Sequence, residues 1–220
     1  MTRFQWYRKL TGTKSKSFPD WISKTDETRL QNIPWVLLDE KDRPFYVTEK
    51  MDGQSATYWV KSKLFGWEFG ICSRTVRKHA LDGSNWSRAA KDLKIKEKLL
   101  KVGKNIAIQG ELCGPGIQKN KYSFDGYRLF IFNVFDIDAK RWYNVDELEW
   151  FCNLYGFNCV PVLTKSFQLL NTVNKMGNYS DGKSVYGDTL REGLVFRSND
   201  SGKPLSFKMV SPKFLLKYGE

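Results

Sequence analysis

A lysine that precedes an Asp-Gly pair is the feature of this sequence with the clearest potential for chemistry. In Glu49-Lys50-Met51-Asp52-Gly53 the lysine ends a β-rich run, so we expect its amine at a strand end that faces a cleft. A lysine amine attacks phosphorus only when it is deprotonated, which requires burial or neighbouring cations to lower its pKa. Arg74 and Lys208 are the candidates for that electropositive surround. A strand that ends in an Asp-Gly turn would have the same sequence without any catalytic role. Other segments must therefore show whether Lys50 is a nucleophile.

The charge balance favours a polyanionic partner. The chain has 36 basic and 24 acidic residues among 220, a formal net charge of +12. Each phosphate that a basic residue neutralises releases condensed counterions, so nucleic acid is the expected partner. Net charge does not separate an enzyme from a binding protein. A basic protein without such a partner and a non-catalytic RNA-binding module both stay open.

The cysteines and the single histidine argue against a zinc site. The four cysteines include no Cys-x-x-Cys pair, and His79 has no metal partner nearby in sequence. We expect reduced structural thiols and an exposed histidine without a role. The longest apolar stretch, around residues 129–135, is far too short to span a bilayer, and the N-terminus lacks a long apolar core. We expect a soluble, unsecreted protein of the cytoplasm, either of its own cell or of a host cell.

Hydrophobic patterning predicts mostly strands, with helices between them. We expect residues 1–43 to form a short-helical or irregular lead-in to the core. Asn144 and Glu147 form a capping box for a helix that Gly156 ends. Residues 129–135 lack clean alternation, as in a central strand that is covered on both faces. The predicted strands are 45–51, 55–63, 67–73, 105–112, 127–137, 193–197 and 205–210, and the predicted helices are 84–101, 145–155 and 167–176.

Further segments follow Lys50 in the order found in the covalent nucleotidyltransferases, the superfamily of DNA ligases, RNA ligases and RNA capping enzymes. The resemblance spans about Phe18 to Tyr218. Ser73-Arg74-Thr75 is similar to the superfamily's arginine motif, and residues 109–114 are similar to its ribose-binding segment. Residues 132–136 are similar to its base-stacking strand. Glu192-Gly193-Leu194-Val195 is similar to its late acidic motif, and Ser206-Phe207-Lys208 to its closing lysine motif.

Within that superfamily the sequence is most similar to RNA ligases of the nick-sealing branch. The extended segment of residues 110–122 and the upstream residues 23–29 resemble the corresponding segments of those enzymes. Gln54-Ser55 lacks the arginine that DNA ligases usually place just after the glycine that corresponds to Gly53. A DNA ligase or a capping-type guanylyltransferase stays open as an alternative.

The resemblance implies a fold and a domain organisation. The fold would be α+β, a nucleotidyltransferase domain of ATP-grasp-like type, with antiparallel β-sheets flanked by helices around a nucleotide cleft. One adenylyltransferase domain would cover residues 1–220, with residues 1–43 as its lead-in. No extra strand-rich stretch follows the closing motif, so we expect neither an OB-like nor a helical appendage.

The resemblance also implies an activity. An ATP-dependent RNA ligase would form a lysyl-AMP on Lys50, pass the AMP to an RNA 5'-phosphate, and let a 3'-hydroxyl displace it to seal the strand. ATP and Mg²⁺ or Mn²⁺ would be the cofactors. The partner would be nicked duplex or structured RNA, and the protein would act as a monomer.

Each matched residue receives a role from the same resemblance. Glu49 would read the adenine edge, Phe132 and Val195 would enclose the ring, and Glu111 would hold the ribose. The catalytic residues would be Lys50, Lys208, Glu192 and Arg74. The residues that bind ATP or AMP would be Glu49, Lys50, Asp52, Gly53, Arg74, Glu111, Phe132, Glu192, Val195 and Lys208. Metal would be held through water by Asp52, Glu111 and Glu192.

One departure concerns the closing motif. Families of this kind usually end it with two lysines one residue apart, whereas Ser206 and Val210 flank Lys208 here. We expect Lys203 or Lys213 to supply the second phosphate contact, or that contact to be missing.

Overall fold

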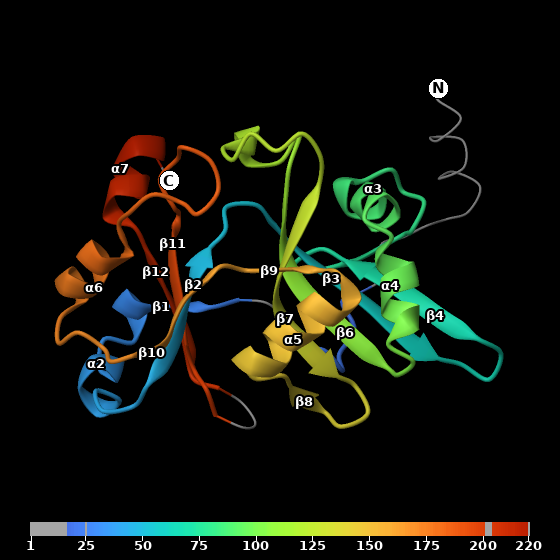
Figure 1. Ribbon diagram of the computed structural model, residues 1–220, viewed down its shortest axis with the longest axis horizontal. Coiled ribbons are helices and arrows are strands. Elements are labelled where there is room, and N and C mark those ends of the chain that lie inside the picture. Colours follow the sequence, from blue (N-terminus) through green and yellow to red (C-terminus); the bar gives the residue numbers. More distant parts are fainter. Residues whose placement is uncertain (1–16, 25, 201–203, 220) are drawn as a thin grey trace.

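Two β-sheets lie side by side in the computed structural model of this protein, with the helices packed around them (Figure 1). The structure describes residues 17–24, 26–200 and 204–219. Most strand pairs are antiparallel, and the two parallel pairings between strands involve only two residue pairs each. The fold is therefore α+β with antiparallel sheets, as the sequence predicts.

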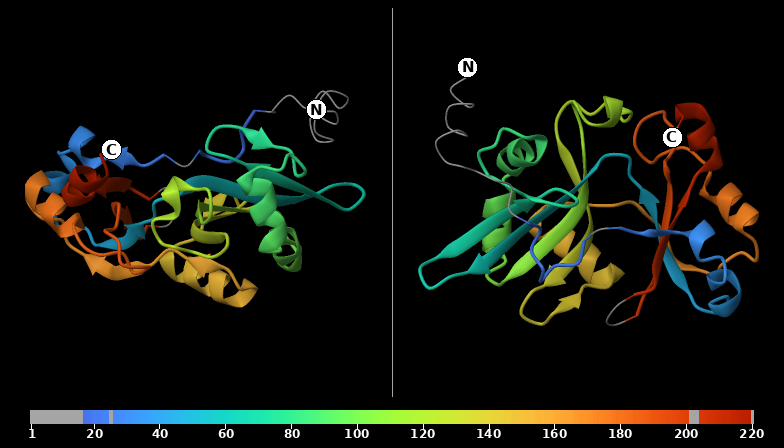
Figure 2. Two further views of the ribbon diagram at one scale, coloured as in Figure 1. Left: turned by 90° about the horizontal axis from the view of Figure 1, so that it is seen from above. Right: turned by 180° about the vertical axis from the view of Figure 1, so that it is seen from behind.

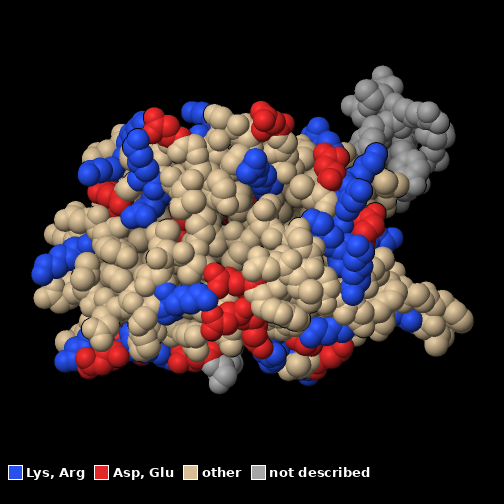
Figure 3. Space-filling model, in the orientation of Figure 1, with Lys and Arg blue, Asp and Glu red and all other residues tan. Residues whose placement is uncertain are grey.

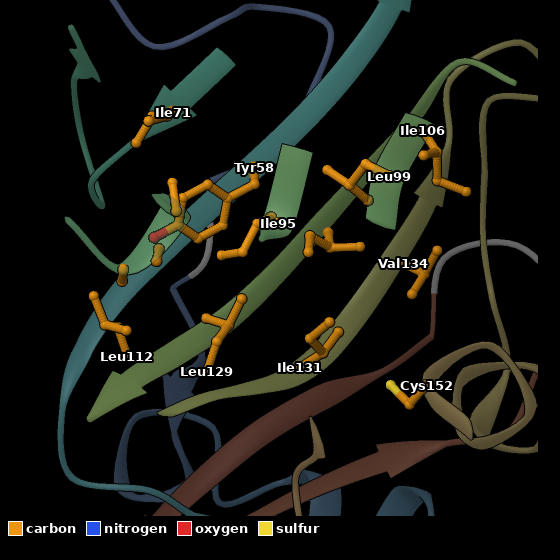
Figure 4. Close-up of a cluster of buried hydrophobic side chains, with 14 of the residues drawn as sticks. Tyr58, Ile71, Ile95, Leu99, Ile106, Leu112, Leu129, Ile131, Val134 and Cys152 are labelled. Carbon is orange, nitrogen blue, oxygen red and sulfur yellow. The ribbon is translucent and has the colours of Figure 1, made fainter. Parts of the chain in front are cut away.

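The larger sheet is buried on both faces at its middle. Ile95 and Leu99 belong to the cluster through which three helices cover one face (Figure 4). Phe18 and Ile22 pack on the opposite face, against Trp59. Each such side chain contributes about 1.5–3 kcal/mol to the free energy of folding when it is fully buried. Packing on both faces therefore makes the sheet a rigid support. The strands in spatial order are β5 (Arg77–Lys78), β4 (Trp67–Cys72), β3 (Gln54–Ser62), β6 (Ile106–Cys113), β7 (Arg128–Asp136) and β8 (Arg141–Trp142), with β9 (Asn158–Cys159) beside β7; the helices are α3 (Asn85–Asp92), α4 (Ile95–Lys101) and α5 (Val145–Tyr155).

The smaller sheet has a core rich in phenylalanine. The ring of Phe207 lies 5.7 Å from that of Phe45 and 5.3 Å from that of Phe196, measured between ring centroids. Leu30, Val36 and other apolar side chains from the short helices close this core. The strands in spatial order are β1 (Thr28–Arg29), β12 (Ser206–Val210), β11 (Gly193–Ser198), β2 (Phe45–Lys50) and β10 (Val162–Phe167); the helices are η1 (Leu30–Asn32), α2 (Val36–Asp39), α6 (Val173–Ser180) and α7 (Pro212–Tyr218).

The chain crosses between the sheets at two places besides its N-terminal part. It leaves the smaller sheet at Lys50, the last residue of β2, and enters the larger sheet at Gln54, the first residue of β3. It returns from β9 to β10 through Val160 and Pro161. Residues 17–24 and 26–29 run along the outside from the larger to the smaller sheet (Figure 2). The interior near these crossings is filled by Met51, Cys113, Tyr122, Phe124, Phe130 and Val160.

The capped helix over residues 145–155 is confirmed. The Asn144 side chain accepts a hydrogen bond from the Glu147 N–H, the Glu147 carboxylate accepts one from the Asn144 N–H, and Gly156 adopts the left-handed conformation at the C-terminal end. The predicted strands are confirmed as well, with ends that differ by at most one residue.

Two helix predictions are wrong. Residues 84–101 form two helices, α3 and α4, because Lys94 adopts the left-handed conformation with φ 51°. In an unbroken helix Ile95 would lie about 240° around the axis from Ala89, so the break lets both side chains reach the same core. Residue 167 ends β10 instead of beginning a helix, and α6 begins after its cap Thr172, whose hydroxyl accepts a hydrogen bond from the Lys175 N–H at 3.2 Å.

Helix α7 follows β12 directly and has no counterpart in the sequence prediction. The Ser211 hydroxyl caps it by accepting from the Phe214 N–H at 3.1 Å, and Pro212 occupies its first turn. Within the described ranges, no helix combines the length and the apolar character that crossing a bilayer would need.

Candidate active site

The nucleophile motif lies where the chain passes from one sheet to the other. Lys50 pairs with Gly193, the first residue of β11. Gly53 approaches β6 so closely that a Cβ atom there would lie 2.5 Å from the Leu112 carbonyl oxygen and 2.8 Å from Cys113 Sγ. The position therefore requires glycine, because any side chain would push the motif away from β6.

A cleft of about 480 Å³ opens between the sheets beside Lys50. Its walls come from β2, β11 and β12 of the smaller sheet and from β3, β6 and β7 of the larger sheet. A cavity of a few hundred Å³ with convergent polar groups has the size of a small-molecule site. All ten residues that the sequence predicts for the site line it, namely Glu49, Lys50, Asp52, Gly53, Arg74, Glu111, Phe132, Glu192, Val195 and Lys208.

The Lys50 amine forms an ion pair with the Glu192 carboxylate. The pairing of β2 with β11 brings these two residues together, although 142 positions separate them in the sequence. Their side chains are 22% and 14% exposed, so water screens the attraction less than it would at the surface. The carboxylate orients the amine in the cleft. An attack by the amine on phosphorus requires that this pairing be given up.

Glu111 lies in the cleft among like charges. Burial raises the pKa of its carboxyl to about 8; the Lys50 ammonium acts against that rise, and the charges of Glu192 and Asp52 add to it. Glu111, Glu192 and Asp52 thus lie near Lys50, with Lys121 paired to Asp52. A further cation beside Glu111 would favour its ionised form.

Asp52 is held from several sides. Its carboxylate pairs with Lys121, its N–H donates to the Tyr122 hydroxyl at 2.7 Å, and Cys113 Sγ lies 3.6 Å from its carbonyl oxygen. The Lys121 amine also lies 4.6 Å and 4.7 Å from the ring centroids of Phe214 and Tyr218 of α7. Sequence analysis gave Lys121 no role, although it lies within the RNA-ligase-like residues 110–122. The structure places Lys121 as the link between the nucleophile motif and α7.

Two of the predicted cations share a carboxylate at one end of the cleft. Asp26 Oδ2 lies 2.6 Å from Arg74 Nη2, and Asp26 Oδ1 lies 3.6 Å from Lys208 Nζ. Burial alone would raise the pKa of Asp26, but Arg74 and Lys208 outweigh it and hold that pKa below its usual value. Two cations that already share one anion have a suitable arrangement for a phosphate group.

Two apolar side chains and a buried acid also line the cleft. Phe132 of β7 and Val195 of β11 both face the cleft, from different sheets. The Glu49 carboxylate, 1% exposed, accepts hydrogen bonds from the Ser184 hydroxyl and, at 2.9 Å, from the Val185 N–H. Burial raises the pKa of Glu49 despite these two donors. Apolar side chains from two sheets, together with a fixed acceptor in the same cleft, can hold a heterocyclic base.

Arg197 is a cleft residue that sequence analysis missed. Its guanidinium is buried, pairs with Glu27 at 2.6 Å and donates to the Phe132 carbonyl at 2.9 Å and to the Ser206 hydroxyl at 3.0 Å. Arg197 and Ser206 are direct partners on β11 and β12. A cation therefore lies opposite Ser206, where the second closing lysine is lacking.

Lys203 and Lys213 are the residues predicted to supply the second phosphate contact. Lys213 lies outside the cleft: it is 69% exposed on α7 and 3.9 Å from Asp181, so the prediction that it contacts the site is wrong. Lys203 lies outside the described residues.

Direct metal ligation by protein alone has no support in the described part of the chain. No group of three or more His, Cys, Asp or Glu side chains there could hold a metal ion. A divalent cation next to Glu111 and Glu192 would need water or phosphate oxygens as its other ligands, which is the usual situation for Mg²⁺.

The raised pKa of Glu111 predicts a change in stability with pH. The folded protein binds this proton more tightly than the unfolded chain, where the group titrates near its ordinary value of 4.5. The contribution to stability is therefore fully present below pH 4.5 and is lost as the pH rises through about 8. Glu111→Gln should unfold with a free energy higher than wild type by roughly 2–4 kcal/mol at pH 9, with little difference at pH 5.

Urea denaturation at both pH values measures this effect. Glu97→Gln, a change at an exposed residue of α4, serves as the matched control and should follow wild type at both. An identical pH dependence in Glu111→Gln and wild type would show that Glu111 does not carry the effect.

The comparisons with known proteins agree with the geometry. The family model described as RNA ligase matches residues 43–218. Among solved structures, the Naegleria gruberi RNA ligase with PPi is 32% identical with a TM-score of 0.83, over 93% of this chain and 60% of that one. A glutamate-to-alanine mutant of that ligase with ATP and Mn is 30% identical with a TM-score of 0.85, over 96% and 63%.

A lysine-to-methionine mutant of the same ligase with AMP and Mn is 30% identical, with a TM-score of 0.83, over 95% of this chain and 62% of that one. This chain thus spans about three-fifths of the length of these solved chains. A comparison with curated protein sequences gives no significant match.

Proposed function

This chain belongs to the RNA ligase family, and from that premise we propose that it is an ATP-dependent RNA ligase with Lys50 as its nucleotide acceptor. One observation carries the proposal: the ten residues that the superfamily resemblance selected in the sequence line a single cleft, with Lys50 among them. The solved Naegleria gruberi structures with PPi, with ATP and Mn, and with AMP and Mn support a nucleotide as the first substrate.

The apolar wall of the cleft is the proposed base site. The adenine ring lies between Phe132 and Val195, and Glu49 reads its edge, with the carboxylate fixed by Ser184 and Val185. Glu111 receives a ribose hydroxyl. Burial raises the pKa of its carboxyl, and a cation bound nearby would favour the ionised form, which accepts from the ribose hydroxyl.

The cationic end of the cleft is the proposed phosphate site. The phosphates take the place of the Asp26 carboxylate between Arg74 and Lys208, and Lys208 neutralises the charge that develops on the α-phosphate. The Lys50 amine loses a proton and attacks the α-phosphorus. A P–N bond forms, the bond to the β-phosphate oxygen breaks, and pyrophosphate leaves.

Two further transfers complete the proposed reaction. An oxygen of the RNA 5'-phosphate attacks the AMP phosphorus, the P–N bond breaks, and the Lys50 amine is restored. The RNA 3'-hydroxyl then attacks the activated 5'-phosphate, loses its proton, and AMP leaves as the strand is sealed. Both transfers depend mainly on positioning and on charge neutralisation.

The acidic surround of Lys50 fits a divalent cation. Glu111 and Glu192 would hold Mg²⁺ or Mn²⁺ through water, together with phosphate oxygens, whereas Asp52 is engaged by Lys121 and contributes through its charge. When bound, the metal would supply positive charge that favours the neutral form of the Lys50 amine and offsets charge on the phosphates.

The proposed partner is nicked duplex or structured RNA with 5'-phosphate and 3'-hydroxyl ends. We further propose one nucleotidyltransferase domain over residues 1–220 that acts as a monomer in the cytoplasm. The four cysteines, all free in the structure, support a reducing compartment.

Strand sealing tests this function directly. With ATP, Mg²⁺ or Mn²⁺ and a nicked RNA duplex, the protein should attach AMP to itself and join the strands. GTP in place of ATP should give no label, which separates the protein from a guanylyltransferase. A nick with a deoxyribose 3'-end should be sealed more slowly than one with ribose. Preferential sealing of the deoxyribose nick would indicate a DNA ligase, and RNA binding without any covalent nucleotide would indicate a non-catalytic module.

A further inference from the structure

The outer surface of α3 and α4 carries a dense group of cations. Residues 78–104 contain eight Lys or Arg and three Asp or Glu, a net charge of +5. Figure 3 shows Lys and Arg side chains in a row over these two helices. We call the exposed members the α3–α4 basic face, which consists of Arg88, Lys91, Lys94, Lys96 and Lys101.

The cations of this face lack acidic partners among the residues that the structure describes. None of the five forms an ion pair with any of those residues, and the Arg88 guanidinium donates to the neutral Asn85 side chain, at 3.0 Å. The surface near α5 differs, because Lys165 pairs with both Asp146 and Glu149 at 2.6 Å. The five cations of the α3–α4 basic face are therefore not engaged in ion pairs with described residues, although Asp92 and Glu97 are exposed on the same helices.

The positive charge of this face affects a neighbouring lysine, Lys98. The Lys98 amine donates to the Gly156 carbonyl at 2.6 Å and lies 5.0 Å from the Phe157 ring centroid. Burial lowers the pKa of Lys98, and the charge of Lys101 lowers it further. Crowding of like charges has a cost in the free protein, and a bound polyanion would remove it.

The packing of the two helices fixes where the cations point. Ala89, Ala90, Ile95 and Leu99 face the core of the larger sheet. The break at Lys94 lets α3 and α4 both pack on that sheet, so their polar residues face outward together. The face is thus part of a rigid support.

The α3–α4 basic face is connected to the cleft through Trp86. This residue of α3 lines the cleft, and its Nε1–H donates to the Ser55 carbonyl at 2.9 Å. The Lys78 amine lies 4.9 Å from the Trp86 ring centroid. A strand whose end reaches Lys50 could therefore continue past Trp86 onto these helices.

We infer that the α3–α4 basic face binds the phosphate backbone of the RNA strand that enters the cleft; the inference rests on the proposed function. Side chains of lysine and arginine that neutralise phosphates provide affinity and orientation without reading sequence. The face is accordingly a docking surface for any RNA of suitable shape.

A triple substitution tests this surface. Lys91→Gln, Lys96→Gln and Lys101→Gln together keep the side-chain stems and remove three charges. Binding to a nicked RNA duplex is measured by fluorescence anisotropy over a range of salt concentrations. We expect an affinity at least about tenfold weaker at 0.1 M salt and a shallower dependence of log K on log salt, by about 0.9 for each phosphate that the variant no longer neutralises.

The matched control removes the same charge elsewhere. Lys41→Gln, Lys140→Gln and Lys175→Gln also change exposed lysines, and this variant should bind RNA like wild type. Attachment of AMP to Lys50 should stay within twofold in both triple variants, which shows that both are folded.

Two results would overturn the inference. One is wild-type affinity and salt dependence in the first triple variant, and the other is an equal loss of affinity in both variants. Failure of the proposed function is distinguishable from either, because it appears as missing AMP attachment in wild type.

Discussion

Lys50→Ala should abolish covalent attachment of AMP to the protein, a loss of at least about 10⁴-fold. Lys50 is the lysine at the end of β2 whose amine faces the cleft and pairs with Glu192. An alanine side chain has no atom that can form the P–N bond. Denaturing electrophoresis after incubation with ATP labelled at the α-phosphate measures the loss.

Lys50→Arg separates the nucleophile from its charge. Arginine keeps the positive charge that faces Glu192, but its guanidinium does not give up a proton in proteins and is no nucleophile. We expect this variant to be as inactive as Lys50→Ala. Substantial labelling of Lys50→Arg would mean that position 50 serves only as a cation.

Lys208→Ala should lower the rate of AMP attachment by about 100- to 1,000-fold, the usual effect of removing one donor that stabilises developing charge. Lys208 belongs to β12, its side chain is 20% exposed, and its amine lies 3.6 Å from the Asp26 carboxylate at the proposed phosphate end. Since its proposed role is exerted in the transition state, kcat should fall more than the affinity for ATP.

Lys213→Ala is the matched control for Lys208→Ala. Lys213 is also a lysine near the end of the chain, but it is 69% exposed on α7 and does not line the cleft. Its loss should change the rate by less than twofold. If the two variants lost activity equally, the proposed role of Lys208 would be wrong. Single-turnover measurement of labelled protein over time provides both rates.

The strands around the site could be predicted because their pattern is local. Residues 45–50 are rich in β-branched and aromatic side chains, residues 193–198 contain an apolar run of three, and the capping box of Asn144 and Glu147 marks the start of α5 within four residues. The break at Lys94 could not be predicted in this way. It depends on Ile95 and Leu99 reaching a sheet core built from distant segments.

Local sequence patterns also predicted part of the site, whereas contacts between distant segments determine the rest. Motif order selected ten cleft residues, because the superfamily's spacing is visible in one sequence. Lys121 escaped notice because its partners are Asp52, 69 positions away, and the rings of Phe214 and Tyr218 on a helix that was not predicted. Arg197 was missed because an arginine in a strand is usually exposed, and its burial depends on partners from distant segments, Glu27 and Phe132, besides Ser206.

Mapping the labelled residue tests the central claim most directly. Wild-type protein is incubated with Mg²⁺ or Mn²⁺ and with ATP labelled at either the α- or the γ-phosphate, then digested, and the labelled peptide is sequenced by mass spectrometry. We predict that label is retained only from the α-position and that it lies on Lys50. Absence of label, label from the γ-position, or label on another residue would contradict the account.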